Sequence, residues 1–485
     1  MKNLEEYLNE NIEVENIELY MNKLNIDDKM LLFKINEYKK IAFSENIILK
    51  EELLRDIWNH FRVTWIEVIN NKTKMVYKSP EISNNNNGLK PLAINYSYER
   101  NIQSDFLEMK ARNLRSSIEN WRDEHIIFSS GMSALTNLIL NFKSMIRNNP
   151  IKKNKIFFWG AYFESRVFLD FIEDKTLEVR KFESEKDLCE AIEKEDFDLL
   201  LLEPVRYDWE LNVLNIEKII ESISKLQNIK YRLVIFDTTL ISENLPLNKI
   251  LEKSKNIPYI IFAQFNSLLK LNQEGLEFAN AGLVSLYTNN LYFKDINSES
   301  IAIYLRKMRT ILGTGLDLRE ILLLDNPFTF NRKKVQIYSE KVFLNNSLLA
   351  KSISQKGLFK EVVHPSIGNR ASFIWAKSPF VILKLHEDNL ENYGFLLGVL
   401  IFESQKRLLD FYMGSSFGFR NSRFEVIIPK TIEKKGIFKI AMGNQNYESV
   451  QRIIELIKEI SEYENICRLK EKYKDIKPIN FNSLE

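Results

Sequence analysis

Four short apolar runs, each continuous rather than alternating, constrain the fold of this chain more than any other feature. They cover, in chain order, residues 155–159, 198–203, 232–237 and 259–263. Strands that are apolar on both faces are typical of a mostly parallel sheet covered by helices. Amphipathic segments at 133–146 and 216–226 are the expected covering helices. We therefore expect an α/β domain with an open sheet, in which ligands bind beyond the carboxyl ends of the strands.

The rest of the chain is organised around this domain. Residues 1 to about 80 have apolar positions at three- and four-residue spacing, which predicts helices, and the asparagine-rich tract 83–88 predicts a linker. A long helix is expected at 333–354, followed by further helices at 389–404 and 447–463. The expected parts are a helical N-terminal extension at 1–90, an α/β domain at 91–330 and a smaller α+β domain at 331–485.

The charged residues nearly cancel, with 68 Lys and Arg against 66 Asp and Glu and a formal net charge of +2. That balance excludes an overall electrostatic attraction to nucleic acid or to an anionic membrane. Cys189 and Cys467 are far apart, and the four histidines form no ligand pair, so we expect neither a disulfide framework nor a metal. We find no secretory signal and no apolar stretch of bilayer length, so a cytoplasmic protein is expected.

The polar residues that follow the apolar runs are the candidates for chemistry. Residues 128–134 pass from a short strand through a turn of small residues into a helix, whose free N–H groups can hold a phosphate. Tyr162 follows one run and offers a flat ring for stacking. Asp237 closes another run, and a carboxylate there can bind a metal, a ribose or a protonated ring nitrogen.

Lys270 follows the last run among apolar neighbours. Partial desolvation of its ammonium would lower its pKa and favour the nucleophilic amine, which can form a Schiff base. Each of these four features alone is common in proteins that bind no such ligand. In this chain order they are the parts needed to hold pyridoxal phosphate: a phosphate cradle, a stacking ring, an acid for the pyridine nitrogen and a Schiff-base lysine.

From about residue 96 onward the sequence resembles the Cys/Met metabolism family of pyridoxal-phosphate enzymes, which includes cystathionine γ-synthase, cystathionine lyases and methionine γ-lyase. The matching elements are Tyr98-x-Arg100, the Ser-Gly-Met turn at 130–134, Asp237-x-Thr239, Ser267-x-x-Lys270 and the Ser-Leu-Gly-like loop at 414–418. The resemblance implies the aspartate aminotransferase fold, called fold type I: a large α/β domain with a mostly parallel sheet and a smaller α+β domain.

The same resemblance implies roles for individual residues. Lys270 would carry the Schiff base and move protons, Tyr162 would stack on the cofactor ring, and Asp237 would stabilise the pyridinium. The other cofactor-binding residues that it implies are Gly131, Met132, Ser267, Thr239, Tyr207 and, across the subunit interface, Tyr98 and Arg100. Because such a site is shared between subunits, a homodimer or homotetramer is implied.

The departures from the family fall mainly on substrate-facing positions. The family's asparagine beside the cofactor's phenolic oxygen is missing from 203–208, where Tyr207 or Asp208 stands in, and Leu269 replaces a threonine. Lys439 stands where the family has an arginine that grips the substrate carboxylate, and lysine offers a point charge without the fork. The expected substrate-binding residues are Lys439, Ser416 and Arg420, with Arg423 as an alternative to the last.

These expectations define a pyridoxal-phosphate-dependent lyase or transferase that acts on an amino acid by elimination or replacement at the β or γ carbon, in a specialised biosynthetic pathway. An aminotransferase or another carbon-skeleton reaction is the alternative enzyme. A non-catalytic interaction scaffold is the alternative of another class, although it would need neither Lys270 nor Asp237. We expect no nucleic-acid partner and no membrane partner.

Overall fold

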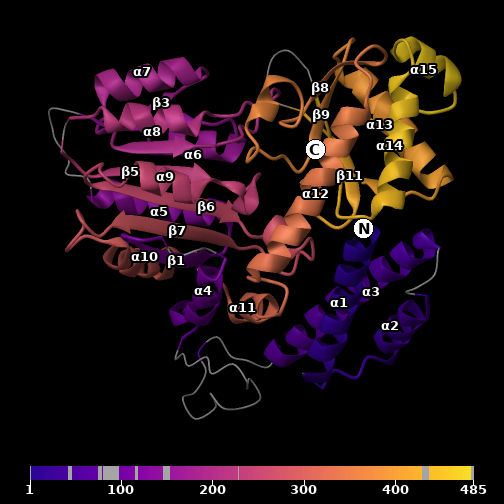
Figure 1. Ribbon diagram of the computed structural model, residues 1–485, viewed down its shortest axis with the longest axis horizontal. Coiled ribbons are helices and arrows are strands. Elements are labelled where there is room, and N and C mark those ends of the chain that lie inside the picture. Colours follow the sequence, from indigo (N-terminus) through magenta and orange to yellow (C-terminus); the bar gives the residue numbers. More distant parts are fainter. Residues whose placement is uncertain are drawn as a thin grey trace.

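The computed structural model describes residues 2–23, 25–41, 46–74, 79, 98–114, 118–145, 153–227, 229–428 and 436–481. Figure 1 shows a large α/β lobe on the left, a smaller lobe with a second sheet at the upper right, and a group of helices at the lower right. The expected linker at 83–88 lies outside the described residues.

The large lobe is built on a seven-stranded sheet. Its strands are β1 (Trp121–Phe128), β2 (Asn154–Trp159), β3 (Leu177–Lys181), β4 (Leu199–Leu202), β5 (Arg232–Asp237), β6 (Ile260–Ser267) and β7 (Gly282–Asn289). They lie in the order β1-β7-β6-β5-β4-β2-β3. Strand β7 is antiparallel to both of its neighbours, and the other pairs are parallel. The carboxyl ends of β1, β2, β4, β5 and β6 therefore meet at one edge of the sheet.

Helices cover both faces of this sheet. They are α4 (Asp105–Arg112), α5 (Gly131–Met145), α6 (Phe163–Ile172), α7 (Glu185–Glu195), α8 (Ile216–Ser224), α9 (Leu247–Lys253), α10 (Ser298–Leu312) and α11 (Leu318–Leu324), with short 3-10 turns η2 (Glu99–Asn101), η3 (Ser242–Asn244) and η4 (Leu271–Gln273). Alternate residues of each strand enter different cores. Phe157 and Val234 pack with α7, α8 and α9, whereas Ile156 and Ile235 pack with α5, α6 and α10. This explains why the runs are continuously apolar.

The smaller lobe has its own five-stranded sheet and core. Helix α12 (Arg332–Ser352) enters it, and its other elements are β8 (Phe359–Val363), η5 (Gly368–Ser372), β9 (Val381–Leu385), α13 (Leu390–Lys406), β10 (Phe411–Met413), β11 (Ser422–Ile427), β12 (Ile437–Ala441), α14 (Tyr447–Ser461) and α15 (Ile466–Lys472). The strand order is β10-β11-β12-β9-β8. Strands β11 and β12 are antiparallel, and their register sets Glu425 directly opposite Lys439.

The N-terminal helices are α1 (Lys2–Lys23), α2 (Lys29–Ile41) and α3 (Ile47–Thr73). Trp58, Phe61 and Trp65 of α3 are buried in one core with Phe328 and with residues of α11. The Trp65 indole N–H donates to the carbonyl oxygen of Leu323 at 3.1 Å. These helices are therefore packed against the rest of the molecule through a common core.

The expected helices lie within a few residues of the observed ones, and the differences fall on two strands of the large sheet. Strand β5 has the predicted bounds, but β6 continues four residues beyond the expected 263 and ends at Ser267. Strand β7 is buried along its whole length, and it was not predicted because Ser285 and Thr288 interrupt its apolar pattern. Among the helices of the described ranges, none is long and apolar enough to cross a membrane.

Candidate active site

The turn between β1 and α5 is held tightly against the sheet edge. The Ser129 N–H donates to the carbonyl oxygen of Thr314 at 2.9 Å. A Cβ atom at Gly131 would lie 3.2 Å from the Cα atom of Ser267, and one at Gly282 would lie 2.1 Å from the carbonyl oxygen of Ser130. The first turn of α5 therefore sits directly over the end of β6. Its Ser133 N–H donates to the Ser130 hydroxyl at 3.0 Å, and the N–H groups of Gly131 and Met132 are the ones placed to bind an anion such as a phosphate.

Asp237, Thr239 and Ser267 form a chain of hydrogen bonds at the ends of β5 and β6. The Thr239 N–H donates to the Asp237 carboxylate at 2.9 Å, and the Ser267 N–H donates to the Thr239 hydroxyl at 3.1 Å. Desolvation raises the pKa of Asp237 to about 6, although the bonds from Thr239 act in the opposite direction. A cationic partner would stabilise the ionised form of this carboxylate.

Glu203 is a functional candidate that the sequence analysis did not single out. It follows β4, and its buried carboxylate accepts the N–H groups of Ala161 at 3.0 Å, Tyr162 at 2.9 Å and Tyr207 at 2.9 Å. Burial, followed by the negative charge of Asp237, raises the pKa of Glu203 to about 7. Glu203 thereby fixes the two loops that carry the tyrosines. The only sequence signal was its place directly after an apolar run.

Tyr162 and Tyr207 form an aromatic wall over this edge. Their ring centroids are 6.0 Å apart, with an interplanar angle of 83°. Burial raises the pKa of the Tyr162 phenol, and the neighbouring Glu164 raises it further. Tyr162 therefore stays protonated at neutral pH and can donate a hydrogen bond.

Lys270 lies just past β6 among aromatic rings. Its Nζ atom donates to the Ser416 hydroxyl at 2.5 Å and lies 5.6 Å from the ring centroid of Phe417 and 5.9 Å from that of Phe419. Desolvation lowers the pKa of Lys270, and the positive charge of Lys439 lowers it further. This is the direction in which a lysine becomes a nucleophile or a base.

Lys439 is almost completely buried beside Lys270, and it is already paired. Its ammonium forms an ion pair with Glu425 and lies 3.3 Å from the Tyr207 hydroxyl. The Ser416 N–H also donates to Glu425, at 3.2 Å. Glu425 was not recognised in the sequence, since its importance depends on the register of β11 against β12.

Arg420 lies apart from this group. Its guanidinium is 3.7 Å from the ring centroid of Trp58 on α3 and within 4 Å of Glu13 and Glu274. Burial is the main reason that the pKa of Glu274 rises to about 8. The expected substrate role of Arg420 stays a prediction, and its side chain contacts Trp58 and Glu13 of the N-terminal helices as well as Glu274.

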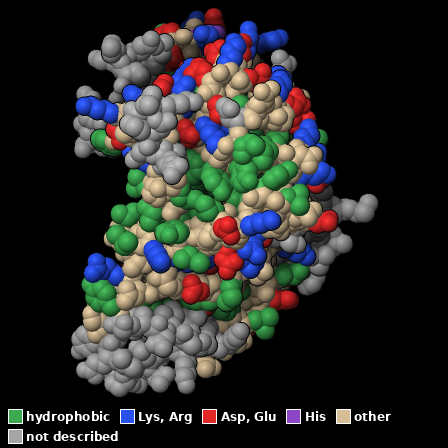
Figure 2. Space-filling model, turned by 90° about the vertical axis from the view of Figure 1, so that its left-hand side faces the viewer, with side chains coloured by type: hydrophobic (Ala, Val, Ile, Leu, Met, Phe, Trp, Pro, Cys, Tyr) green, Lys and Arg blue, Asp and Glu red, His purple; other side chains and the backbone are tan. Residues whose placement is uncertain are grey.

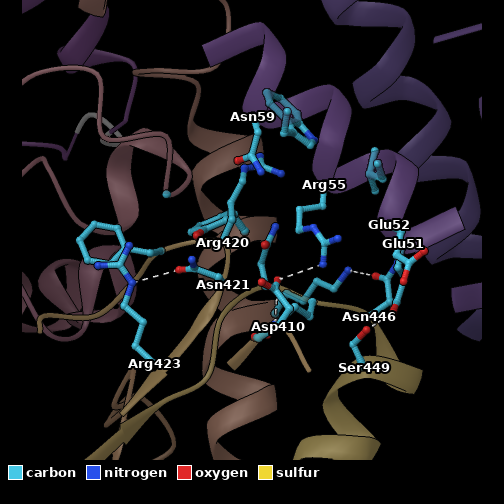
Figure 3. A pocket seen from close by; sticks show the side chains of 18 of the residues that line it. Glu51, Glu52, Arg55, Asn59, Asp410, Arg420, Asn421, Arg423, Asn446 and Ser449 are labelled. Atoms are coloured by element: carbon cyan, nitrogen blue, oxygen red, sulfur yellow. Dashed lines mark hydrogen bonds and ion pairs between the residues drawn. The ribbon is translucent and has the colours of Figure 1, made fainter. Parts of the chain in front are cut away.

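Arg420 lines a cavity of about 700 Å³ between α3, α12 and the smaller lobe. Figure 3 shows Arg55 of α3 pointing toward Asp410, with Asn59 one turn further along α3 and near Arg420. Arg423 lies at one side, paired with Glu277 at 3.3 Å. It stacks at 3.8 Å over Phe419, the ring that also lies beside Lys270. The cavity is therefore separated from the Lys270 surroundings by one aromatic side chain.

Tyr98 and Arg100 belong to the segment around η2. The Arg100 guanidinium lies 5.1 Å from the Tyr98 ring centroid, and the Tyr98 side chain is exposed. Within the described part of the chain, neither shares a recorded contact with Lys270 or Asp237. Their exposure is compatible with the expected contact across a subunit interface.

The residues at this edge fit pyridoxal phosphate in its principal parts. A helix start that requires glycine suits the phosphate, a buried carboxylate of raised pKa suits a protonated pyridine nitrogen, and a desolvated amine suits an aldehyde. Met132 lies in the first turn of α5 beside Gly131. Within the described ranges, no group of three or more His, Cys, Asp or Glu is arranged to hold a metal ion.

The two lobes and their sheets give this chain the α/β fold of pyridoxal-phosphate enzymes of fold type I, as expected. The similar solved structures include cystathionine γ-lyase from yeast, with 17% identity, a TM-score of 0.56, and coverage of 82% of this chain and 97% of that one. A methionine γ-lyase from Micromonospora echinospora has 16% identity, a TM-score of 0.55, and coverage of 79% and 91%.

A further similar structure is cystathionine γ-synthase from Xanthomonas oryzae pv. oryzae in complex with cystathionine. It has 15% identity and a TM-score of 0.56, and the alignment covers 82% of this chain and 98% of that one. No family model matches the sequence, and no curated protein matches it. The relationship is thus one of fold.

Proposed function

We propose that the chain is a divergent member of the Cys/Met metabolism family and a pyridoxal-phosphate-dependent enzyme. Its reaction is an elimination or replacement at the β or γ carbon of an amino-acid-type substrate. The observation that carries this proposal is the meeting of a desolvated Lys270, a buried Asp237 and the Gly131 turn at one sheet edge.

The bound cofactor would supply an electron sink for the carbon next to the substrate nitrogen. Asp237 would hold the proton on the pyridine nitrogen, while Gly131, Met132, Ser267 and Thr239 would hold the phosphate. Lys270 would remove the proton from the substrate's α carbon and return it at a later position, a task favoured by its lowered pKa.

The two tyrosines would complete this chemistry. Tyr162 would cover the cofactor ring and, as a phenol that stays protonated, would donate a hydrogen bond to the leaving group. Tyr207 would stand beside the phenolic oxygen of the cofactor in place of an asparagine. Glu203 would keep both rings in position through their backbone N–H groups.

A homo-oligomer is part of this proposal, with Tyr98 and Arg100 reaching the phosphate of a neighbouring subunit. Exposed apolar side chains support an interface: Phe163, Val167 and Phe171 on α6, and Tyr304 and Ile311 on α10. Figure 2 shows hydrophobic side chains gathered across the middle of one face of the molecule. Such a gathering on a protein surface marks interaction sites.

The test is direct. The purified protein is incubated with pyridoxal phosphate, its visible absorption is recorded, and the complex is reduced with borohydride and analysed by peptide mass spectrometry. We expect a stoichiometric chromophore and attachment at Lys270. A protein that binds no chromophore, or that carries the label at another lysine, contradicts the proposal. The Lys406→Arg variant, altered at an exposed lysine on α13, is the matched control and should bind cofactor normally.

The type of reaction needs a second measurement. Amino acids with leaving groups on the β or γ carbon are screened for release of keto acid, ammonia or thiol. Release of these products supports elimination, and transfer of the amino group to a keto acid supports the aminotransferase alternative. A loaded protein that is inert toward all substrates but retains a specific protein partner would favour the scaffold.

A further inference from the structure

Glu425 occupies a position beside Lys270 that is built to receive a carboxylate. Two donors converge there: the Lys439 ammonium and the backbone N–H of Ser416. The Ser416 hydroxyl in turn accepts from Lys270, and both lysines lie over the same Phe417 ring, at 5.6 and 5.8 Å. A carboxylate bound by these donors therefore lies next to the Lys270 amine. In this chain the side chain of Glu425 supplies that carboxylate.

The pair is held firmly in the sheet. Glu425 and Lys439 are direct cross-strand partners on β11 and β12, and their side chains are 15% and 2% exposed. The aromatic rings of Tyr207, Phe380 and Phe417 surround the ammonium at 5.1 to 5.8 Å. An incoming carboxylate would have to displace Glu425 and leave it unpaired in this apolar pocket, which is strongly unfavourable.

The second cation close to Lys270 is also matched by an acid. Arg423 contributes to lowering the pKa of Lys270, and its guanidinium pairs with Glu277 at 3.3 Å. In the described residues around the amine, each guanidinium or ammonium other than Lys270 therefore has a carboxylate partner. The remaining acid, Glu164, adds negative charge beside Tyr162. These surroundings disfavour a second carboxylate.

We propose that Glu425 determines specificity by filling this carboxylate position, so that the substrate is a primary amine whose neighbouring carboxyl group is absent or masked as an amide or ester. This inference rests on the proposed function and narrows its substrate class. Like-charge repulsion from Glu425 and the loss of the Lys439 partner act together against a free α-carboxylate.

The experiment compares two probes that differ only at the carboxyl group, L-methionine and L-methioninamide. The protein loaded with pyridoxal phosphate is titrated with each at pH 7 and pH 9, and binding is read from the change in cofactor absorption. Using two pH values separates the effect of the carboxyl group from the effect of protonation of the probe's amine. We expect the amide to bind at least about tenfold more tightly than the acid at both values, a difference of ~1.4 kcal/mol.

The Glu425→Gln variant keeps the shape of the side chain and removes its charge. In this variant the ratio of the two probes' affinities should fall by at least about tenfold, because Lys439 is then free to pair with the carboxylate of L-methionine. The affinity for L-methioninamide should change little. Glu361→Gln is the matched control, since Glu361 pairs with Lys384 at 2.9 Å between β8 and β9 of the same sheet. It should leave the difference unchanged.

Several results overturn the inference. They are equal or tighter binding of the acid by the unaltered protein, failure of both probes to bind, and an unchanged preference in the Glu425→Gln variant. If that variant does not fold, the unaltered protein and a Glu425→Asp variant decide the question. Failure of the proposed function is seen separately, because a protein without cofactor absorption is recognised before any titration begins.

Discussion

The Asp237→Asn substitution should stabilise the cofactor-free protein, and increasingly so as the pH rises. Burial raises the pKa of Asp237 from 3.8 to about 6, so the folded state binds this proton more tightly than the unfolded state does. Below about pH 4 Asp237 is protonated and does not destabilise the folded state. The loss of folding free energy grows between the two pKa values and is complete above about pH 6 to 7. Asparagine keeps an oxygen for the Thr239 N–H but never ionises.

The magnitude follows from the size of the shift. A shift of about 2 pKa units corresponds to ~3 kcal/mol at pH 8, and about half of this is present at pH 5. Because part of the residue's surface faces the solvent-accessible edge, we expect a measured gain of about 1.5 to 3 kcal/mol at pH 8. Loss of the Asp237 charge also lowers the raised pKa of Glu203, which acts in the same direction.

The assay is equilibrium urea denaturation of cofactor-free protein at pH 5 and pH 8, with fluorescence and circular dichroism as independent probes. The Asp295→Asn variant, altered at an exposed position after β7, should match the unaltered protein at both values. A stability difference for Asp237→Asn that is constant or shrinks toward pH 8 would refute the reasoning. The same variant should bind pyridoxal phosphate more weakly, because the pyridine nitrogen loses its partner.

Three further predictions concern packing and backbone geometry, and urea denaturation measures each. Gly282→Ala should cost about 3 kcal/mol, because the new methyl group meets the Ser130 carbonyl oxygen at 2.1 Å. Gly313→Ala meets no atom within 4 Å but has a φ of +66°, so it should cost only about 1 kcal/mol; an equal cost for both would contradict the steric explanation. Trp58→Ala should cost about 3 to 5 kcal/mol, since it empties a buried site and removes the ring under Arg420; a loss below 1 kcal/mol would mean that α3 contributes little to the fold.

Four strands of the large sheet were predictable because burial on both faces produces continuously apolar runs in the sequence. The run at 232–237 became β5 with the same bounds, and the turn before Gly131 became a helix start. The alternation between two cores explains this success, since each strand residue contacts apolar helices on one side or the other. Strand β7 was not predicted because its buried polar residues look exposed in the sequence, whereas in the fold they have hydrogen-bond partners. Ser285 lies 2.9 Å from His125, and such pairing depends on tertiary structure.

The site was predictable where its residues follow strands and unpredictable where it depends on pairing. Lys270 and Asp237 could be singled out as candidates because the ends of parallel strands converge at one edge. Glu425 has no sequence signature, since only the β11–β12 register sets it against Lys439. The contact between the Arg420 guanidinium and Trp58 is unpredictable for a similar reason, because nothing in a linear sequence shows that these residues, more than 300 positions apart, meet.

Helix α3 has contacts with both lobes at once. Near one end, the Ser449 hydroxyl of α14 donates to Glu51. Further along, the Arg62 guanidinium donates to the carbonyl oxygens of Leu276 and Glu277, which follow the loop that carries Lys270. The helix therefore acts mechanically as a strut. A rotation of the smaller lobe against the large one would have to carry α3 with it or break the bonds at one end, and would thus be coupled to the segment just after Lys270.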